Sequence, residues 1–320
     1  MFKQKKIRQI SIVLVLLLLL FGWLTIKEKK QGQRSFKAYV VETDTANVNK
    51  IEIFSGKLNE TVTLNKVNKQ WMLILDDNQV QADRQLIDEL LGQLHQLKPK
   101  RIAGTQKQSW PDFELTDSMA IRVVLKSDKK KLTDLLVGKF TYSQGQSTNP
   151  YQQQKMIVTS YVRPYNEDFV YAVDGFLSIM VNRGNDSFRN RSLIDAKPEQ
   201  WLRLSYNLST GESYALQKTD GKWYIGQQLA DSATVHSYLN NLGRLSGQNF
   251  ADQSPETSSF ATNSRLTIET ENNTTIELKA GLNSLGEEVY ISSQNQGNVF
   301  NDSTLSRQIF VDPSYFLNPN

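Results

Sequence analysis

Apolar and polar residues follow the same order in two stretches of the chain that lie about 150 residues apart. In the first stretch, short alternating runs cover 51–53, 61–64 and 71–75; in the second they cover 201–204, 214–216 and 223–225. Alternation over a few residues, with turn residues between the runs, predicts small antiparallel meanders. Asp220-Gly221 is a hairpin signal, and Val67-Asn68-Lys69 occupies the matching place in the first stretch.

The spacing of apolar residues changes after each meander. The first series is Ile87, Leu90, Leu91, Leu94 and Leu97, and the second is Val235, Tyr238, Leu239, Leu242 and Leu245. Such spacing places the side chains on one face of a helix. Asp83 and Asp231 stand where an N-cap accepts the first free backbone N–H groups, although neither is followed by the Glu or Gln of a full capping box.

Particular residues also recur at equal spacing in the two stretches. Leu64, Lys66, Trp71 and Ala82-Asp83 correspond to Leu216, Lys218, Trp223 and Ala230-Asp231. We interpret this agreement as a duplicated unit. Further strands are expected after each helix, at 120–125, 132–137, 157–162 and 169–173, and at 265–268, 275–278, 289–292 and 299–300. The predicted fold class is α+β, with two tandem homologous modules, 48–185 and 186–320, each a twisted antiparallel sheet with one main helix.

An uninterrupted apolar run, Ile10 to Ile26, precedes these patterns. At about 1.5 Å per residue the run is near the lower limit for a bilayer-spanning helix, and basic residues at both ends can extend its reach. No small-residue cleavage site follows it, which favours an uncleaved anchor. We therefore predict a single transmembrane helix at 10–26, a basic cytoplasmic tail at 1–9 and a polar stalk at 27–47. The body is expected outside the cytoplasm, on the inner (cytoplasmic) membrane.

The net charge of +4 comes from the ends of this anchor. Residues 1–9 carry four basic residues and no acid, and 27–37 carry five basic residues and one acid, which leaves about −4 for 38–320. A mildly acidic body is a poor binder of nucleic acid, whose affinity for proteins depends on neutralised phosphates. The chain has no cysteine, which excludes disulfides and thiolate chemistry.

The order of several short motifs resembles a bacterial family known as domain of unknown function 4340. The motifs are Lys66/Trp71, Ala82-Asp83 and their second copies, then Val137-Gly138, Tyr161–Arg163, Val170-Tyr171 and Arg191–Asp195. The resemblance covers most of 48–250. It implies a membrane-anchored envelope protein, with some relatives linked to exporter-type transporters, including gliding-motility systems. It implies no catalytic residues.

No motif along the chain predicts a reaction. The two histidines, His95 and His236, lack a metal-ligand spacing, and no phosphate-binding loop or nucleophile elbow occurs. Trp71 and Trp223 occupy the same repeat position beside apolar neighbours, which favours core packing over carbohydrate stacking. We therefore predict a non-catalytic protein without cofactor or metal.

The most distinctive polar group lies around the expected module boundary. It comprises Tyr161, Arg163, Tyr171, Arg189 and Arg191. Two arginines one residue apart can grip a carboxylate or phosphate of a partner, and the alternative is a structural salt-bridge set with Asp174 or Asp195. The leading hypothesis is an envelope scaffold or accessory protein that binds a partner protein such as a transporter component, through the module interface or an exposed sheet edge. A lipid- or glycan-binding module and an undetected hydrolase are the alternatives.

Overall fold

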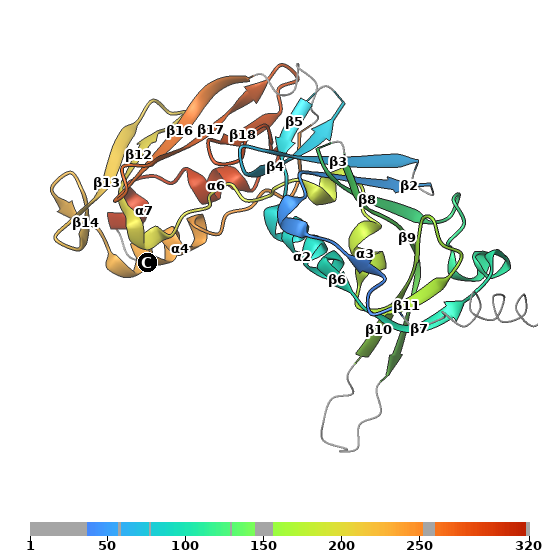
Figure 1. The fold of residues 1–320 in the computed structure, drawn as a ribbon. Coiled ribbons are helices and arrows are strands. Elements are labelled where there is room, and N and C mark those ends of the chain that lie inside the picture. Colours follow the sequence, from blue (N-terminus) through green and yellow to red (C-terminus); the bar gives the residue numbers. More distant parts are fainter. Residues whose placement is uncertain are drawn as a thin grey trace, which may run out of the picture.

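The computed structural model describes residues 37–317 except 57–58, 77, 129, 145–155 and 252–259. Two large antiparallel sheets form the two halves of an elongated molecule (Figure 1). A third, two-stranded sheet pairs β1 (Val41–Glu42) with β6 (Gln96–Leu97). Strands account for 47% and helices for 21% of the structure. The fold is therefore mainly β.

The N-terminal sheet has nine strands in the order β5-β4-β3-β2-β8-β9-β10-β11-β7. Their bounds are β2 (Lys50–Ser55), β3 (Glu60–Val67), β4 (Gln70–Leu75), β5 (Asn78–Gln81), β7 (Pro99–Gly104), β8 (Ile121–Ser127), β9 (Lys130–Gln144), β10 (Met156–Pro164) and β11 (Val170–Asp174). All neighbouring strands are antiparallel. Short 3₁₀ helices, η1 (Thr45–Asn47), η2 (Lys107–Ser109), η3 (Pro111–Phe113) and η4 (Asn185–Phe188), lie in the connections.

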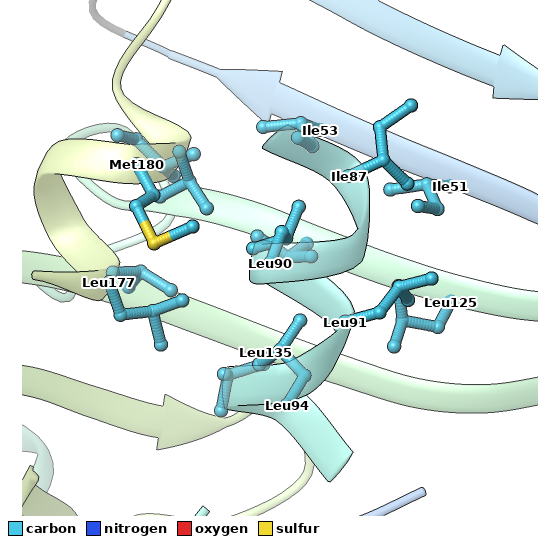
Figure 2. Close-up of a cluster of buried hydrophobic side chains, with 14 of the residues drawn as sticks. Ile51, Ile53, Ile87, Leu90, Leu91, Leu94, Leu125, Leu135, Leu177 and Met180 are labelled. Carbon is cyan, nitrogen blue, oxygen red and sulfur yellow. The ribbon is translucent and has the colours of Figure 1, made fainter. Parts of the chain in front are cut away.

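Helix α2 (Arg84–His95) packs its apolar face on this sheet (Figure 2). Ile87, Leu90 and Leu94 are fully buried against strand residues that include Ile51, Ile53, Leu125 and Leu135. The short helix α3 (Leu177–Val181) adds Leu177 and Met180 to the same cluster. The Asp83 carboxylate accepts the Leu86 N–H at 3.1 Å, which confirms the predicted N-cap.

The C-terminal sheet has seven strands in the order β15-β14-β13-β12-β16-β17-β18. Their bounds are β12 (Trp201–Asn207), β13 (Ser213–Thr219), β14 (Lys222–Ile225), β15 (Gln228–Leu229), β16 (Phe260–Thr270), β17 (Thr275–Asn283) and β18 (Glu288–Ser292). The 3₁₀ helix η5 (Pro198–Gln200) leads into it. One face is covered by α4 (Ser232–Leu242), α6 (Leu305–Ile309) and α7 (Ser314–Leu317) (Figure 1). Asp231 caps α4 by accepting the Thr234 N–H at 2.8 Å, again as predicted.

The two predicted hairpins are built alike. Each has a two-residue turn whose two central residues have positive φ, as a type I′ hairpin requires. These residues are Asn68 and Lys69 in the first hairpin, and Asp220 and Gly221 in the second. The carbonyls of Trp71 and Trp223 each accept the N–H of the alanine before the helix, Ala82 or Ala230, at 2.9 Å. Trp71 is buried in the first core, and the half-buried Trp223 packs against the second, so both serve packing.

The predicted fold class is nevertheless wrong as a whole. The chain folds into three sheets, and each large sheet carries more than one helix. α3 joins α2 on the first, and α6 and α7 join α4 on the second. Helices of four or five residues are too short to show a helical period, so the sequence pattern did not reveal them. The nine-stranded sheet also exceeds the seven-stranded one by β11 and β7.

The segments 1–9 and 10–26 and residues 27–36 of the expected stalk lie outside the described residues. Among the residues from 37 onward that the structure describes, no helix is long and apolar enough to cross a membrane. The module boundary near residue 185 and the anchor at 10–26 stay predictions.

The packing of α2 predicts opposite effects for two substitutions within it. Leu90→Ala leaves a cavity under the helix and should lower the free energy of unfolding by about 2–5 kcal/mol. Gly92→Ala adds a methyl group where no atom lies within 4 Å and should raise it by about 0.5–1 kcal/mol. Urea denaturation followed by circular dichroism measures both. A Leu90→Ala loss below that of an exposed control, Glu89→Ala, would contradict this packing.

Candidate functional site

The five residues predicted to form one polar site lie in three separate places. Tyr161, Arg163 and Tyr171 belong to β10 and β11 of the N-terminal sheet. Arg189 and Arg191 lie in the connection between the two large sheets, beside Phe250. The sequence placed them together because they are near one another along the chain, but the sheet separates them in space.

Arg163 is held inside the N-terminal half, with 2% of its surface exposed. Its Nη1 donates to the carbonyls of Tyr165 and Glu167, both at 3.2 Å, and its Nη2 donates to the Leu115 carbonyl at 3.3 Å. Its guanidinium stacks on the Trp110 ring at 3.5 Å from the centroid. Burial lowers the pKa of Arg163, and the exposed Asp117, at 3.5 Å, opposes that effect. Arg163 therefore fastens the loops at this end of the sheet.

The two tyrosines lie on opposite faces of the sheet: Tyr161 shares the face of Arg163, and Tyr171 packs in the core under α2. The Tyr161 ring lies 4.7 Å from that of Phe113, and its hydroxyl accepts a bond from Arg101 at 3.4 Å. Tyr171 donates its hydroxyl to Glu167 at 3.1 Å. Burial, with the nearby Glu167 carboxylate second, raises the pKa of Tyr171 to about 12. A phenol with this pKa stays neutral at physiological pH, so Tyr171 is a structural donor.

Arg189 and Arg191 share the Phe250 ring, at 3.6 and 4.7 Å from its centroid. Buried Arg189 donates Nε to Asn298 at 2.9 Å and Nη1 to Asp186 at 3.0 Å. Burial lowers the pKa of Arg189, with the Asp186 carboxylate opposing. Arg191 donates to the carbonyls of Gly247 and Gln248.

The proposed pairing of these arginines with Asp174 or Asp195 is not what the structure gives. Asp174 pairs instead with Lys100 at 2.7 Å, while the arginines use Asp117 and Asp186. The alternative that gave the arginines a structural role describes the geometry better than a partner-gripping pair does. Their planar groups are occupied by backbone carbonyls and aromatic rings within the chain.

Sequence reasoning missed the amide groups that join the two sheets. The Gln81 N–H donates to the Gln296 carbonyl at 2.7 Å, and Asn298 Nδ2 donates to the Gln81 carbonyl at 2.8 Å. Asn295 and Asn298 are both buried, although the loop that carries them consists mainly of polar residues, as exposed loops do. Gly297 has a positive φ of 77°, and a Cβ there would lie 2.5 Å from the Gln79 carbonyl oxygen. That glycine, between Gln296 and Asn298, is the signal that could have indicated a close approach.

A cleft of about 750 Å³ opens beside this junction. It is lined by residues of the β3–β4 turn, the start of α2 and the connection, among them Trp71, Asp83, Arg84 and Arg191. Most of these charged groups already have partners: Asp83 caps the helix, and Arg84 pairs with Asp88 at 3.3 Å. The cleft thus offers little unpaired charge to a ligand.

The two histidines lie apart from this cleft. His95 Nδ1 is 2.8 Å from the Thr43 carbonyl oxygen, within the packing of α2. Among the described residues, no group of three or more His, Asp or Glu side chains is placed to hold a metal ion. The prediction of a non-catalytic protein without a cofactor stays a prediction.

The feature that stands out is a two-stranded arm, which we define as 138–144 of β9 and 156–158 of β10. It extends beyond the rest of the sheet (Figure 1). β8 pairs with β9 only as far as Val137, and β11 pairs with β10 only from Thr159. Phe140, Tyr142 and Met156 share one face of the arm and are 42%, 72% and 59% exposed. These three large apolar side chains therefore leave much of their surface to solvent.

The Arg163 cluster predicts a stability loss on a conservative substitution. Arg163→Lys keeps the charge but loses the planar group that reaches three carbonyls and stacks on Trp110. We expect the free energy of unfolding to fall by about 2 kcal/mol in urea titrations. The exposed Arg101→Lys should change it by less than about 0.5 kcal/mol. Equal effects of the two would contradict the fastening role.

The raised pKa of Tyr171 predicts that the free energy of unfolding falls at high pH. Its pKa is raised from the ordinary tyrosine value of 10.0 to about 12, so the folded chain holds this proton where the unfolded chain releases it. Its contribution to stability is full below pH 10 and is lost as the pH rises to about 12. Tyr171→Phe should therefore lose less free energy of unfolding over this interval than the wild type. Tyr142→Phe, at an exposed ring, should keep the wild-type decline; identical declines in all three proteins would contradict the assignment.

Comparison with known proteins places the chain in one family. No curated protein and no solved structure matches it. The sequence model of one family, described as a domain of unknown function (DUF4340), matches residues 71–263. This range contains the strand-to-helix segment at Trp71, both arginine clusters and the arm, and it covers more than half of the chain. The match confirms the resemblance noted from the sequence motifs: the chain belongs to the DUF4340 family.

Proposed function

We propose that this chain is a membrane-tethered accessory protein that binds a partner protein outside the cytoplasm and catalyses no reaction. The observation that carries the proposal is the arm formed by β9 and β10. The apolar run at 10–26 supports the tether, and its flanking charges favour an extracytoplasmic body. A subunit of an envelope transporter is the class of partner that the family resemblance favours.

The arm has the properties of a docking element. Its apolar face, formed by Phe140, Tyr142 and Met156, continues the sheet face that α3 covers at Ser160. The chain from 140 to 154 has no charged residue, so no charge must be desolvated when a partner covers it. Depletion of charge and enrichment of aromatic residues and methionine characterise the centres of protein interfaces.

The base of the arm is held firmly. Ser178 donates its hydroxyl to the Gly138 carbonyl, and the buried Ser160 hydroxyl accepts the Ser178 N–H at 3.2 Å and donates to the Gly175 carbonyl at 2.9 Å. Gly138 also packs so closely that a Cβ would lie 2.0 Å from the Phe113 carbonyl oxygen. A pre-ordered element loses little entropy when it binds, which favours affinity.

A protein suits the arm better than lipid does. Within the described residues, the outer edges of the ribbon at 140–144 and 156–158 have no neighbouring strand. Unpaired backbone N–H and C=O groups are costly in hydrocarbon, which has nothing to offer them. An extended segment of a protein can pair with such an edge while its side chains cover the apolar face.

Site-specific photo-crosslinking in the native membrane tests this proposal. A photoreactive residue replaces Tyr142 or Met156 in the full chain. In the control proteins it replaces Thr141, on the opposite face of the same strand, or Leu285, in the C-terminal half. We expect one discrete protein adduct from 142 and 156 and at least about tenfold less from the controls. Phe140→Ser with Tyr142→Ser should abolish the adduct from 156, because the two substitutions remove the aromatic rings of the apolar face, and a circular dichroism spectrum checks that the variant is folded.

Two results would contradict the proposal. Equal adducts from both faces of the arm would show that contact does not follow the apolar side chains. Adducts with lipid alone would make the arm a membrane contact. The tether is scored separately, because carbonate extraction of the same membranes should leave the chain in the pellet, and its release would refute the anchor without bearing on the arm.

A further inference from the structure

A second surface, on the C-terminal half, has the chemistry of a ligand site. Helix α4 lies beside α6 and α7 under the seven-stranded sheet (Figure 1). Between them runs a groove with two parts, of about 590 and 790 Å³, which share Arg307, Val311 and Tyr315 in their linings. We define the α4–α6 groove as these two parts together.

The floor of the groove is rigid. Tyr206 donates its hydroxyl to that of Tyr238 at 2.9 Å, and Tyr238 donates onward to the Ile309 carbonyl at 2.7 Å. The Tyr238 ring also meets Tyr315 edge-on at 6.0 Å between centroids. Tyr315, by contrast, is 46% exposed and forms part of the wall. A fixed floor with one exposed ring gives a ligand a shaped surface without reorganisation.

Two arginines in the groove lack partners. Arg244 and Arg307 are both exposed, and within the described ranges neither guanidinium forms a hydrogen bond, an ion pair or a ring contact. They differ in this from Arg163 and Arg189, whose guanidinium groups are held by carbonyls and rings. Unpaired guanidinium groups that share one concave surface present several donors in a planar fork, the geometry that suits an oxyanion.

Two carboxylates also line the groove, and among the described residues neither forms an ion pair with Arg244 or Arg307. Asp302 is buried, and it accepts the Gln248 N–H, the Thr304 N–H and the Thr304 hydroxyl. These bonds keep the pKa of Asp302 below its usual value despite burial, which raises it. Asp312 is exposed and lines the other part of the groove, which includes Arg307 but not Arg244. The part that contains both arginines also carries the polar side chains of Asn241 and Ser246.

We propose that the α4–α6 groove binds a small ligand through an oxyanion group, a phosphate or a carboxylate, held between Arg244 and Arg307. The polar wall contributes further hydrogen bonds, and the exposed Tyr315 ring packs on the rest of the ligand. This site is independent of the proposed arm contact, because it lies on the other sheet and shares no residue with it.

Calorimetric titration of the full chain in detergent tests the site. The probes are inorganic phosphate, pyrophosphate, glycerol 3-phosphate as a lipid headgroup analogue, acetate, and glucose as a neutral sugar. We expect millimolar or tighter binding of at least one anion and none of glucose. Arg244→Gln and Arg307→Gln should each weaken binding by about tenfold, which corresponds to about 1.4 kcal/mol.

Arg265→Gln is the matched control. Arg265 is a half-buried arginine of the same sheet that pairs with Glu277 at 3.2 Å, outside the groove. The Arg265→Gln variant should bind the anions as the wild type does. Thermal melts should show that all three variants are folded. Preference for phosphates over acetate assigns a phosphate ligand, and selectivity for glycerol 3-phosphate assigns a lipid headgroup. Absence of anion binding, or binding that survives both groove substitutions, overturns the site.

Discussion

Burial of one apolar helix face against one face of an antiparallel sheet is the constraint on which the rest of this structure depends. α2 and α4 meet this constraint in the same way. Each begins at an aspartate whose carboxylate caps the helix and whose N–H donates to the carbonyl of a phenylalanine far along the chain, Phe188 for Asp83 and Phe316 for Asp231. Both phenylalanines are buried, so the start of each helix is fixed to its core. The arm and the groove take their positions from these two packed layers.

The elements that the sequence predicted are those set by local physics. A helical apolar stripe, an aspartate cap and a two-residue turn each depend on a few neighbouring residues, and α2, α4 and both hairpins confirmed them. The fold class was missed because the number of strands in a sheet and the presence of four- or five-residue helices are decided by distant contacts. β7, for example, joins its sheet beside β11, about 70 residues later in the chain.

The polar site shows the same limit more sharply. A sequence reveals a guanidinium but not the groups that surround it. Arg163 and Arg189 looked like a partner-binding set, yet most of their donors are taken by carbonyls, an amide and a carboxylate inside the chain. Arg244 and Arg307 gave no signal, because they are ordinary surface residues until α4 and α6 bring them to one groove. Desolvation explains the difference: a buried arginine takes most of its partners from its own protein, whereas an exposed one stays available to a ligand.

The junction between the two sheets decides how the arm and the groove relate. It is joined mainly by neutral amides. Asn298 Nδ2 donates to the Gln81 carbonyl, and the Gln81 N–H donates to the Gln296 carbonyl. Asn295 Nδ2 donates to the carbonyls of Asn190 and Ser192 at 2.9 and 2.7 Å. Salt does not screen such bonds as it screens exposed ion pairs. Buried asparagines also tolerate little displacement, since a shifted amide leaves unsatisfied donors. A junction of this kind fixes the orientation of the groove relative to the arm.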